Sequence, residues 1–351
     1  MIYMNVEIND NRIQKDFVGM SFSKFKKSHV KKEMVKCLAS SKVEQSCYWA
    51  GELICAGHYI DVWEIIIFFA SKHIHIGNPK LPIYIAIRIR AFKELVSNHL
   101  GEELSMRNNL QIRELFAEII SILCYSKKSH AFEAVKLKKG EEFSMEVMQP
   151  MLKAPNVSYA ALAFKPEDPK ELFIAINELS YHLSNDSKNS YVACYWLEWL
   201  IEFGMTCKKN KQESISERRT IAMVDEKYKR DSIWIIWDLM FAVARKKNCE
   251  VIVKIIESLL DIFCLKYTRG TTSKRKFILY NCISILTEPI DISTPIWNDK
   301  SQIMRVSQKI NVIYKEIKKN ETSSEQPPPA RNNLTNTLEK IEIMSRHSNI
   351  N

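Results

Sequence analysis

Apolar residues recur along the chain at the three- and four-residue intervals typical of amphipathic helices. Trp49, Leu53 and Gly57 lie four residues apart, and a later segment has apolar residues at positions 112, 115, 116, 119, 120 and 123. This spacing gathers apolar side chains on one face of an α-helix. The pattern predicts a set of helices that pack through their apolar faces.

One segment has a different period. Isoleucines at 83, 85, 87 and 89 alternate with other residues, which is the spacing of a half-buried strand. No second alternating segment of similar strength offers a partner, so we predict a helix here too. Gly and Pro number only 8 and 11 of 351 residues, about 5 % against an average of roughly 12 %. The sequence therefore predicts an all-α fold and disfavours turn-rich sandwiches and glycine-looped nucleotide folds.

The two halves of the chain carry related segments in the same order. Residues 47–57 match residues 194–204 without a gap and share Cys, Tyr, Trp, Leu, Ile and Gly. Residues 62–72 then match 236–246, and an Ile-Ser-Ile-Leu block recurs at 120–123 and 283–286. We infer two related multi-helix domains that arose by internal duplication. The alternative is a coincidental similarity between aromatic helices.

The recurring residues are expected to form the core of each copy, because large rings in apolar helical segments are usually buried. The alternative is exposed rings that stack on nucleic-acid bases. Glycines at the ends of the matched segments are expected to stop their helices, because glycine adopts the left-handed conformation without strain. The predicted repeat-core residues are Tyr48, Trp49, Gly57, Trp63, Tyr195, Trp196, Gly204 and Trp237.

The expected organisation has four parts. Residues 1–20 form an N-terminal extension, 21–150 the first helical repeat, and 151–319 the second, with a charged insertion near 207–230. Residues 320–351 begin as a linker with three consecutive prolines, which cannot continue a helix. Apolar residues at 334, 338, 341 and 344 then follow helical spacing, which predicts either a short docking helix or a frayed tail.

Cysteine usage and hydropathy indicate a compartment. The nine cysteines are odd in number and lie mostly among apolar residues, which favours a reducing environment. The longest apolar run, 65–70, is far shorter than the roughly 20 residues that span a bilayer. The N-terminus does not have the basic and apolar regions of a secretory signal. We expect a soluble, intracellular protein without a membrane span.

Several motifs resemble a known family. The segments 47–57, 70–79 (Ala-Ser-Lys-His-Ile-His-Ile-Gly-Asn-Pro) and 126–131 (Ser-Lys-Lys-Ser-His-Ala) are similar to the C-terminal helical domain of RarA/MgsA-type AAA+ ATPases. The resemblance covers roughly residues 33–135 and implies an oligomerisation role beside DNA-replication machinery. Lys72 and His73 replace the acidic pair of that family. The lysine-, isoleucine- and asparagine-rich composition also resembles proteins of nucleocytoplasmic large DNA viruses, which implies the host cytoplasm, a viral factory or the virion as its location.

No motor accompanies these helices. A phosphate-binding loop requires Gly-x4-Gly-Lys-Ser/Thr, and the nearest segment, 270–274, has neither the second glycine nor the spacing. A Gly-x-Ser-x-Gly nucleophile elbow is absent as well. Repeated acidic residues such as Glu64 and Asp238 are better explained as partners in ion pairs than as catalytic acids. We therefore expect a non-enzymatic protein that needs no cofactor.

Four residues are of the types that bind zinc, but their spacing would not bring them together on one face of a helix. They are Cys55, His58, His73 and His75. Zinc needs sulfur and imidazole ligands that converge tetrahedrally. His73 and His75 point to different sides of a helix, so only a turn or an extended segment would let them converge. The alternative, that these are solvated or core-edge histidines, is the simpler interpretation.

Basic residues form clusters. If these clusters share a face, they would bind nucleic-acid phosphates in a salt-dependent way. Lysine-rich solvated surfaces are the alternative, and the low share of arginine argues against base-specific recognition. The candidate contacts are Lys26, Lys27, Lys31, Lys127, Lys128, Lys138, Lys139, Arg245, Lys246, Lys274, Arg275 and Lys276.

These observations predict an assembly or adaptor protein associated with DNA replication, repair or packaging. It is expected to self-associate or bind a protein partner, with nucleic acid as a further, non-specific partner. The alternatives are a structural protein of a virion or capsid and an enzyme with an unrecognised site.

Overall fold

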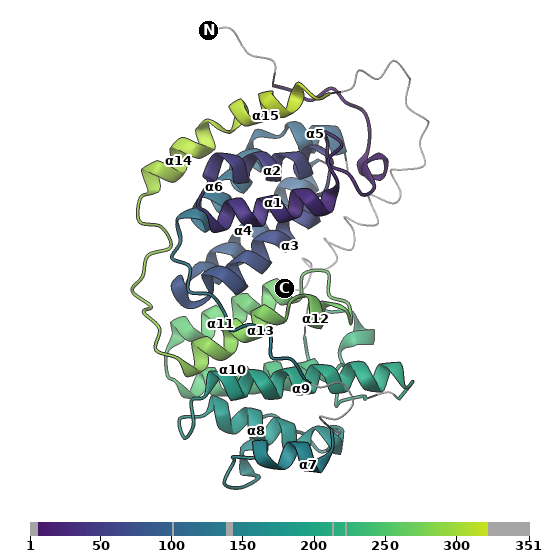
Figure 1. The fold of residues 1–351 in the computed structure, drawn as a ribbon, viewed down its shortest axis with the longest axis vertical. Helices are drawn as coiled ribbons and strands as arrows, with labels where there is room; N and C mark the ends of the chain where they lie inside the picture. Colours follow the sequence, from purple (N-terminus) through teal and green to yellow (C-terminus); the bar gives the residue numbers. More distant parts are fainter. Residues whose placement is uncertain (1–5, 100–101, 138–142, 213, 222, 322–351) are drawn as a thin grey trace. The chain divides into compact units, whose positions relative to one another are not determined.

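The computed structural model describes residues 6–99, 102–137, 143–212, 214–221 and 223–321 (Figure 1). Among these residues the regular structure is helical, with two isolated β-bridges and no strand. The all-α prediction is confirmed. The alternating isoleucines lie in helix α4 (Leu81–Asn98), where Ile85 and Ile89 are buried and Ile87 is exposed. No helix among the described residues is both long and apolar enough to cross a membrane.

The chain divides into two compact units. Unit 1 comprises Met1–Lys128 and Pro295–Asn351, and unit 2 comprises Ser129–Thr294. The division differs from the expected boundary at 150/151, and the residues after 294 belong to unit 1 instead of to the second repeat. The predicted tail from 322 onward lies outside the described residues.

Unit 1 is a bundle of helices from both ends of the chain. Helix α6 is central, because α1 to α5 all pack against it or against a helix that contacts it. Late in the sequence, α14 packs on α6, and α15 packs on α2 (Figure 1). The bounds are α1 (Lys27–Ala39), α2 (Val43–Cys55), α3 (Tyr59–Phe69), α4, α5 (Glu103–Asn108), α6 (Leu110–Tyr125), α14 (Lys300–Gln308) and α15 (Ile310–Lys318).

Glycine permits the close approach of α15 to α2. A Cβ at Gly51 would lie 2.5 Å from Cδ1 of Ile317. Tyr314 and Ile317 of α15 are fully buried. Arg113 of α6 stacks over the Tyr314 ring at 4.1 Å and donates to Asn311 of the same helix at 3.2 Å. This packing explains why residues 300–318 complete unit 1.

The N-terminal segment, defined here as residues 10–20, packs against the end of α2, the start of α3, and α5. Its Phe17 ring is 1 % exposed. Arg107 of α5 donates to the carbonyl of Arg12 at 2.6 Å, and Glu103 accepts from the amide of Gln14 at 2.7 Å. His58, at the start of α3, lies 3.0 Å from the Phe17 carbonyl through Nε2. The segment is therefore held through its backbone and one aromatic anchor.

Unit 2 contains helices in the same order. Helix α8 packs on α9 as α1 packs on α2, and α13 contacts α9, α10 and α11 as α6 contacts α2, α3 and α4. The short α12 contacts α13 as the short α5 contacts α6. The bounds are α7 (Met145–Met148), α8 (Phe173–Leu183), α9 (Ser190–Lys209), α10 (Ile233–Lys246), α11 (Glu250–Phe263), α12 (Thr271–Lys274) and α13 (Lys276–Thr287).

An aromatic pair recurs at matched places in the two units. Trp63 of α3 meets Phe92 of α4 with ring centroids 5.7 Å apart and an interplanar angle of 62°. Trp237 of α10 meets Phe263 of α11 at 5.4 Å and 58°. This match supports the inferred duplication, because the two tryptophans are the residues that the sequence comparison aligns.

The other predicted repeat-core residues differ in burial. Tyr195 and Trp196 are buried, whereas Tyr48 and Trp49 are partly exposed. Trp49 packs edge-on against Phe25 at 5.5 Å. The core prediction for Trp49 therefore holds only in part.

The two matched glycines have different roles. Gly57 has φ +73° and follows α2, where the amides of Gly57 and His58 bond to the carbonyls of Ile54 and Leu53. This is a Schellman motif, so the predicted stop is correct there. The predicted stop at Gly204 is wrong, because α9 continues to Lys209. The same motif ends α9 with Lys211 in the left-handed position, φ +56°.

Candidate functional site

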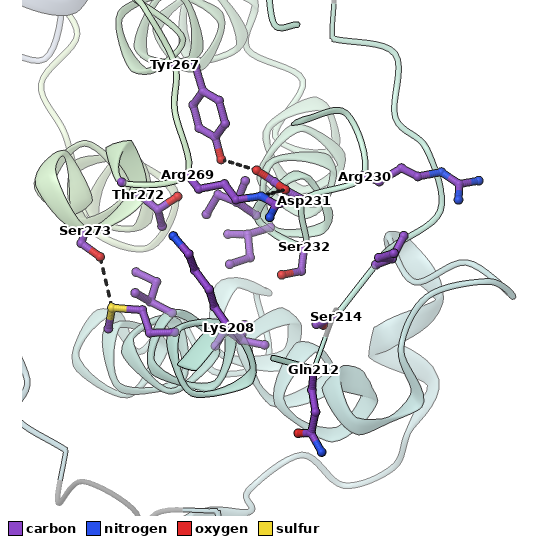
Figure 2. A pocket seen from close by; sticks show the side chains of 18 of the residues that line it. Lys208, Gln212, Ser214, Arg230, Asp231, Ser232, Tyr267, Arg269, Thr272 and Ser273 are labelled. Carbon is purple, nitrogen blue, oxygen red and sulfur yellow. Dashed lines mark hydrogen bonds and ion pairs between the residues drawn. The ribbon is translucent and has the colours of Figure 1, made fainter. Parts of the chain in front are cut away.

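A cavity of about 620 Å³ lies in unit 2, between α9, the insertion that follows it, the start of α10 and the segment that leads into α12 (Figure 2). Its apolar floor comes from two helices that the repeat pattern already predicts. Leu200 and Ile201 belong to α9, and Ile233 and Ile236 belong to α10. Pockets of 300–1,000 Å³ with an apolar lining and a few polar groups are typical of binding sites.

Gly204 explains why the middle of α9 leaves this space open. It lies within the helix and lines the cavity, and a Cβ built there would meet nothing within 4 Å. Glycine inside a helix costs roughly 0.5–1 kcal/mol relative to alanine. At this position the missing side chain enlarges the cavity.

The lining is strongly basic. Of its charged residues, five carry positive charge and one, Asp231, is acidic. Figure 2 shows Lys208 extending from α9 toward Thr272, whereas Arg230 extends away from the centre. The positive lining residues are Lys208, Lys211, Lys227, Arg230 and Arg269. Such a cleft concentrates anions because its field adds over several charges.

Asp231 is held by two neighbours. Its carboxylate accepts from the Tyr267 hydroxyl at 3.1 Å and from Arg269 Nε at 3.2 Å (Figure 2). Burial raises the pKa of Asp231 above its usual range, although Arg269 and Tyr267 offset part of that effect. Asp231, held by Tyr267 and Arg269, is therefore the one carboxylate acceptor among the cationic residues that line the cavity.

Ser214 adds a polar group to the same wall. Its Oγ is buried and has no hydrogen-bond partner among the described residues. Buried hydroxyls are usually bonded, so an unpaired one marks a place where a ligand or water can bind.

The insertion is fastened to the helices by a buried arginine. The amides of Ser216 and Arg219 donate to the carbonyls of Arg230 and Lys229, which pairs the two arms of the insertion. Arg219, 2 % exposed, forms a bidentate pair with Asp168 and bonds Asp238 of α10 through Nε at 3.0 Å. The predicted role of Asp238 in an ion pair agrees with this contact. The wall of the cavity is thereby fixed.

Hydrogen bonds set the charge of this anchor. Burial alone would raise the pKa of Asp168, but bonds from Arg219 and from the amides of Lys165 and Glu217 outweigh it and lower that pKa. Asp168 is therefore ionised at neutral pH and balances the arginine.

Several predicted phosphate contacts in unit 1 have protein partners. Lys27 and Lys31 both pair with Asp61 of α3, and Lys128 donates to Ser41 Oγ at 2.9 Å. Lys26 and Lys127 are exposed.

The predicted contacts in unit 2 also divide. Arg275 is buried and donates to the carbonyls of Ile262, Phe263 and Leu265, so it caps the end of α11, and its assignment as a surface contact is wrong. Lys276 pairs with Glu198 at 2.8 Å. The exposed members are Arg245, Lys246 and Lys274, while Lys138 and Lys139 lie outside the described residues.

The four zinc candidates do not converge. Burial raises the pKa of the Cys55 thiol to about 12, and thiolate is the form that binds metal. His58 bonds to main-chain carbonyls, His75 Nδ1 lies 3.0 Å from the Ser71 carbonyl, and His73 stacks on Phe69. In the described part of the chain no group of three or more His, Cys, Asp or Glu residues is placed to hold a metal ion.

One serine, histidine and carboxylate trio lies in unit 2. Ser187 Oγ is 2.8 Å from Nδ1 of His182, whose Nε2 is 3.6 Å from Glu178. The amides next to the serine, at 188 and 189, already bond to Ser184 and His182 carbonyls, so they cannot stabilise an oxyanion. Glu178 accepts from the amides at 153 and 154. The trio therefore ties these turns to α8.

No family model, no curated protein and no solved structure matches this chain. The match between the two halves of the sequence identified the charged insertion. It did not reveal the cavity, because the residues that line the cavity are spread from 200 to 273.

Proposed function

We propose that this protein is a non-enzymatic helical adaptor that binds an anionic partner in the basic cavity of unit 2. One observation carries the proposal: a cavity of about 620 Å³ combines an apolar floor with five positive residues and one negative residue. Lining charges of one sign attract ligands of the opposite sign and raise their association rate.

A DNA-associated assembly is the setting we propose for this adaptor. The net charge of +10 and the resemblance to an oligomerisation domain of replication-associated ATPases support it. Exposed Lys26, Lys127 and Lys246 would add weak, non-specific attraction to a nucleic-acid backbone.

The test measures binding of two fluorescent polyanions, a single-stranded oligothymidylate and poly-glutamate, to the full chain at low and physiological salt. Light scattering reports the oligomeric state in the same samples. We expect binding of at least one polyanion, weakening as salt rises.

Two charge-reversed variants with the same net charge localise the interaction. Lys208→Glu with Lys211→Glu alters the cavity, and Lys127→Glu with Lys246→Glu alters exposed surface elsewhere. We expect the first pair to weaken binding about tenfold or more and the second about threefold or less. Equal losses would assign binding to general surface charge. No binding by the wild type at low salt would refute the proposal and leave a structural role.

A further inference from the structure

The two units differ at matched places: a segment of the chain packs there in unit 1, and a cavity lies there in unit 2. In unit 1, the end of α2, the start of α3, and α5 hold the N-terminal segment. In unit 2, the matched places, namely α9 around Gly204, the start of α10 and the chain around α12, line the cavity. Gly57 contacts the segment, since a Cβ there would lie 3.2 Å from Cβ of Gln14, whereas its counterpart Gly204 faces open space.

We propose that the cavity of unit 2 receives an extended acidic segment of a partner protein, with an apolar or aromatic side chain on its floor. The inference rests on the proposed function, because it names the class of anion that the basic lining binds. In unit 1 the comparable occupant is an extended peptide with a buried aromatic anchor, Phe17.

The polar groups of the cavity fit a peptide. A peptide backbone offers both N–H donors and C=O acceptors, whereas a phosphodiester offers acceptors only. Asp231 is a carboxylate acceptor in the middle of a basic lining. In unit 1 the carboxylate of Glu103 accepts a backbone amide of the N-terminal segment in a similar way. Asp231 accepts from Tyr267 and Arg269, and its remaining lone pairs can accept a backbone N–H of a peptide, whereas a phosphodiester has no N–H to donate.

The charges supply the remaining selectivity. The segment seated in unit 1 contains both Asp and Arg, and it meets both Arg107 and Glu103. The cavity of unit 2 has one acidic and five basic lining residues, and Lys208 extends across it, so a carboxylate of an acidic segment would meet the Lys208 ammonium group (Figure 2). Its apolar floor, which includes Ile233 and Ile236, accepts one large side chain.

The experiment compares three fluorescent probes on the full chain: a random copolymer of glutamate and tyrosine, poly-glutamate of the same length, and a single-stranded oligothymidylate. We expect the copolymer to bind about tenfold or more tightly than poly-glutamate, because only the copolymer brings an aromatic anchor. The oligothymidylate is expected to bind more weakly than the copolymer and to be insensitive to changes inside the cavity.

Two variants locate the copolymer. Gly204→Leu places a side chain in the cavity from a helical position with nothing within 4 Å of its Cβ, so folding is expected to be preserved. Lys208→Glu reverses one lining charge. We expect each substitution to weaken copolymer binding about tenfold. In Gly204→Leu, the helical content measured by circular dichroism and the melting temperature should be no lower than in the wild type.

Any other outcome would overturn either this inference or the proposed adaptor function. Equal affinities for the copolymer and poly-glutamate would remove the aromatic anchor and with it this inference. Oligothymidylate binding that is tighter and is lost in Gly204→Leu would assign the cavity to nucleic acid, leaving the adaptor function intact. Absence of binding by all three probes would refute the adaptor function itself. Copolymer binding unchanged in both variants would place it outside the cavity.

Discussion

Units 1 and 2 have the same order of helices and share several packed pairs, such as α1 on α2 and α8 on α9, yet they differ in what covers them. Unit 1 is covered by its own chain: residues 10–20 pack against α5, and α15 packs on α2. Unit 2 has a cavity at the matched place, and the charged insertion forms one of its walls. The comparison teaches that segments added to the bundle decide whether this place is covered, as in unit 1, or open as a cavity, as in unit 2.

Buried arginines fasten the added segments in both units. Arg107 and Arg113 hold the chain ends on unit 1, and Arg219 holds the insertion on unit 2. Guanidinium groups suit this role because they donate several hydrogen bonds in a fixed plane.

The largest expected effect comes from removing the aromatic anchor that holds the N-terminal segment on unit 1. Phe17→Ala should lower the free energy of unfolding by about 3–5 kcal/mol, because the ring is buried and Arg12 and Arg107 lie over it. Urea unfolding monitored by circular dichroism measures the change. Val18→Ala, at a side chain 75 % exposed, is the control and should shift stability by about 0.5 kcal/mol or less. A small effect of Phe17→Ala would mean that the segment is not integral to unit 1.

The next prediction breaks the wall of the cavity in unit 2. Arg219→Ala should cost about 3–5 kcal/mol, because it leaves Asp168 as a buried, unpaired carboxylate. Arg218→Ala is the matched control, since Arg218 pairs with Glu226 at the exposed surface, and it should cost about 0–1 kcal/mol. Urea unfolding again provides the measurement, and similar losses in the two variants would contradict the anchoring role.

The two matched glycines should respond with opposite signs. Gly57→Ala should destabilise by about 1–2 kcal/mol, because its φ of +73° strains any L side chain. Gly204→Ala should stabilise by about 0.5–1 kcal/mol, because it lies inside α9 with open space beside it. Thermal melts of both variants measure the difference. A loss of stability in both variants would contradict the placement of Gly204 inside a regular helix with open space beside it.

The smallest effect concerns pH. The pKa of Asp168 is lowered in the folded protein, so its ionised form stabilises the fold fully above the unfolded pKa of about 3.9. That contribution is lost as pH falls through the lower folded pKa. The stability gap between wild type and Asp168→Asn should therefore be constant from pH 7 to 5 and narrow below about pH 4. Urea midpoints at pH 7, 5, 4 and 3 test this, and a gap that widens in acid would contradict it.

The sequence predicted those features that depend on local periodicity. Helical spacing identified the all-α fold, and the matched tryptophans Trp63 and Trp237 were correctly assigned to the core. The stop at Gly57 followed from its left-handed conformation. The stop at Gly204 did not, because nothing local distinguishes a glycine that ends a helix from one that opens space beside it.

Features that depend on long-range packing escaped prediction. No local signal shows that residues 300–318 return to unit 1, because their contacts are with α2 and α6 far earlier in the chain. Arg275 lies in a Lys-Arg-Lys run that suggested an exposed cluster, yet its guanidinium caps α11. The cavity combines residues from distant segments, and only its charged insertion had a visible signature.

The discontinuity of unit 1 has a consequence for biosynthesis. As the ribosome adds residues from the N-terminus, unit 2 is complete at Thr294, before α14 and α15 of unit 1 have been made. Unit 2 can therefore finish folding first, while the apolar surface of α2 around Gly51 still waits for Tyr314 and Ile317. During that interval the nascent chain exposes an apolar helix face, which is prone to aggregate and is the kind of surface that chaperones shield.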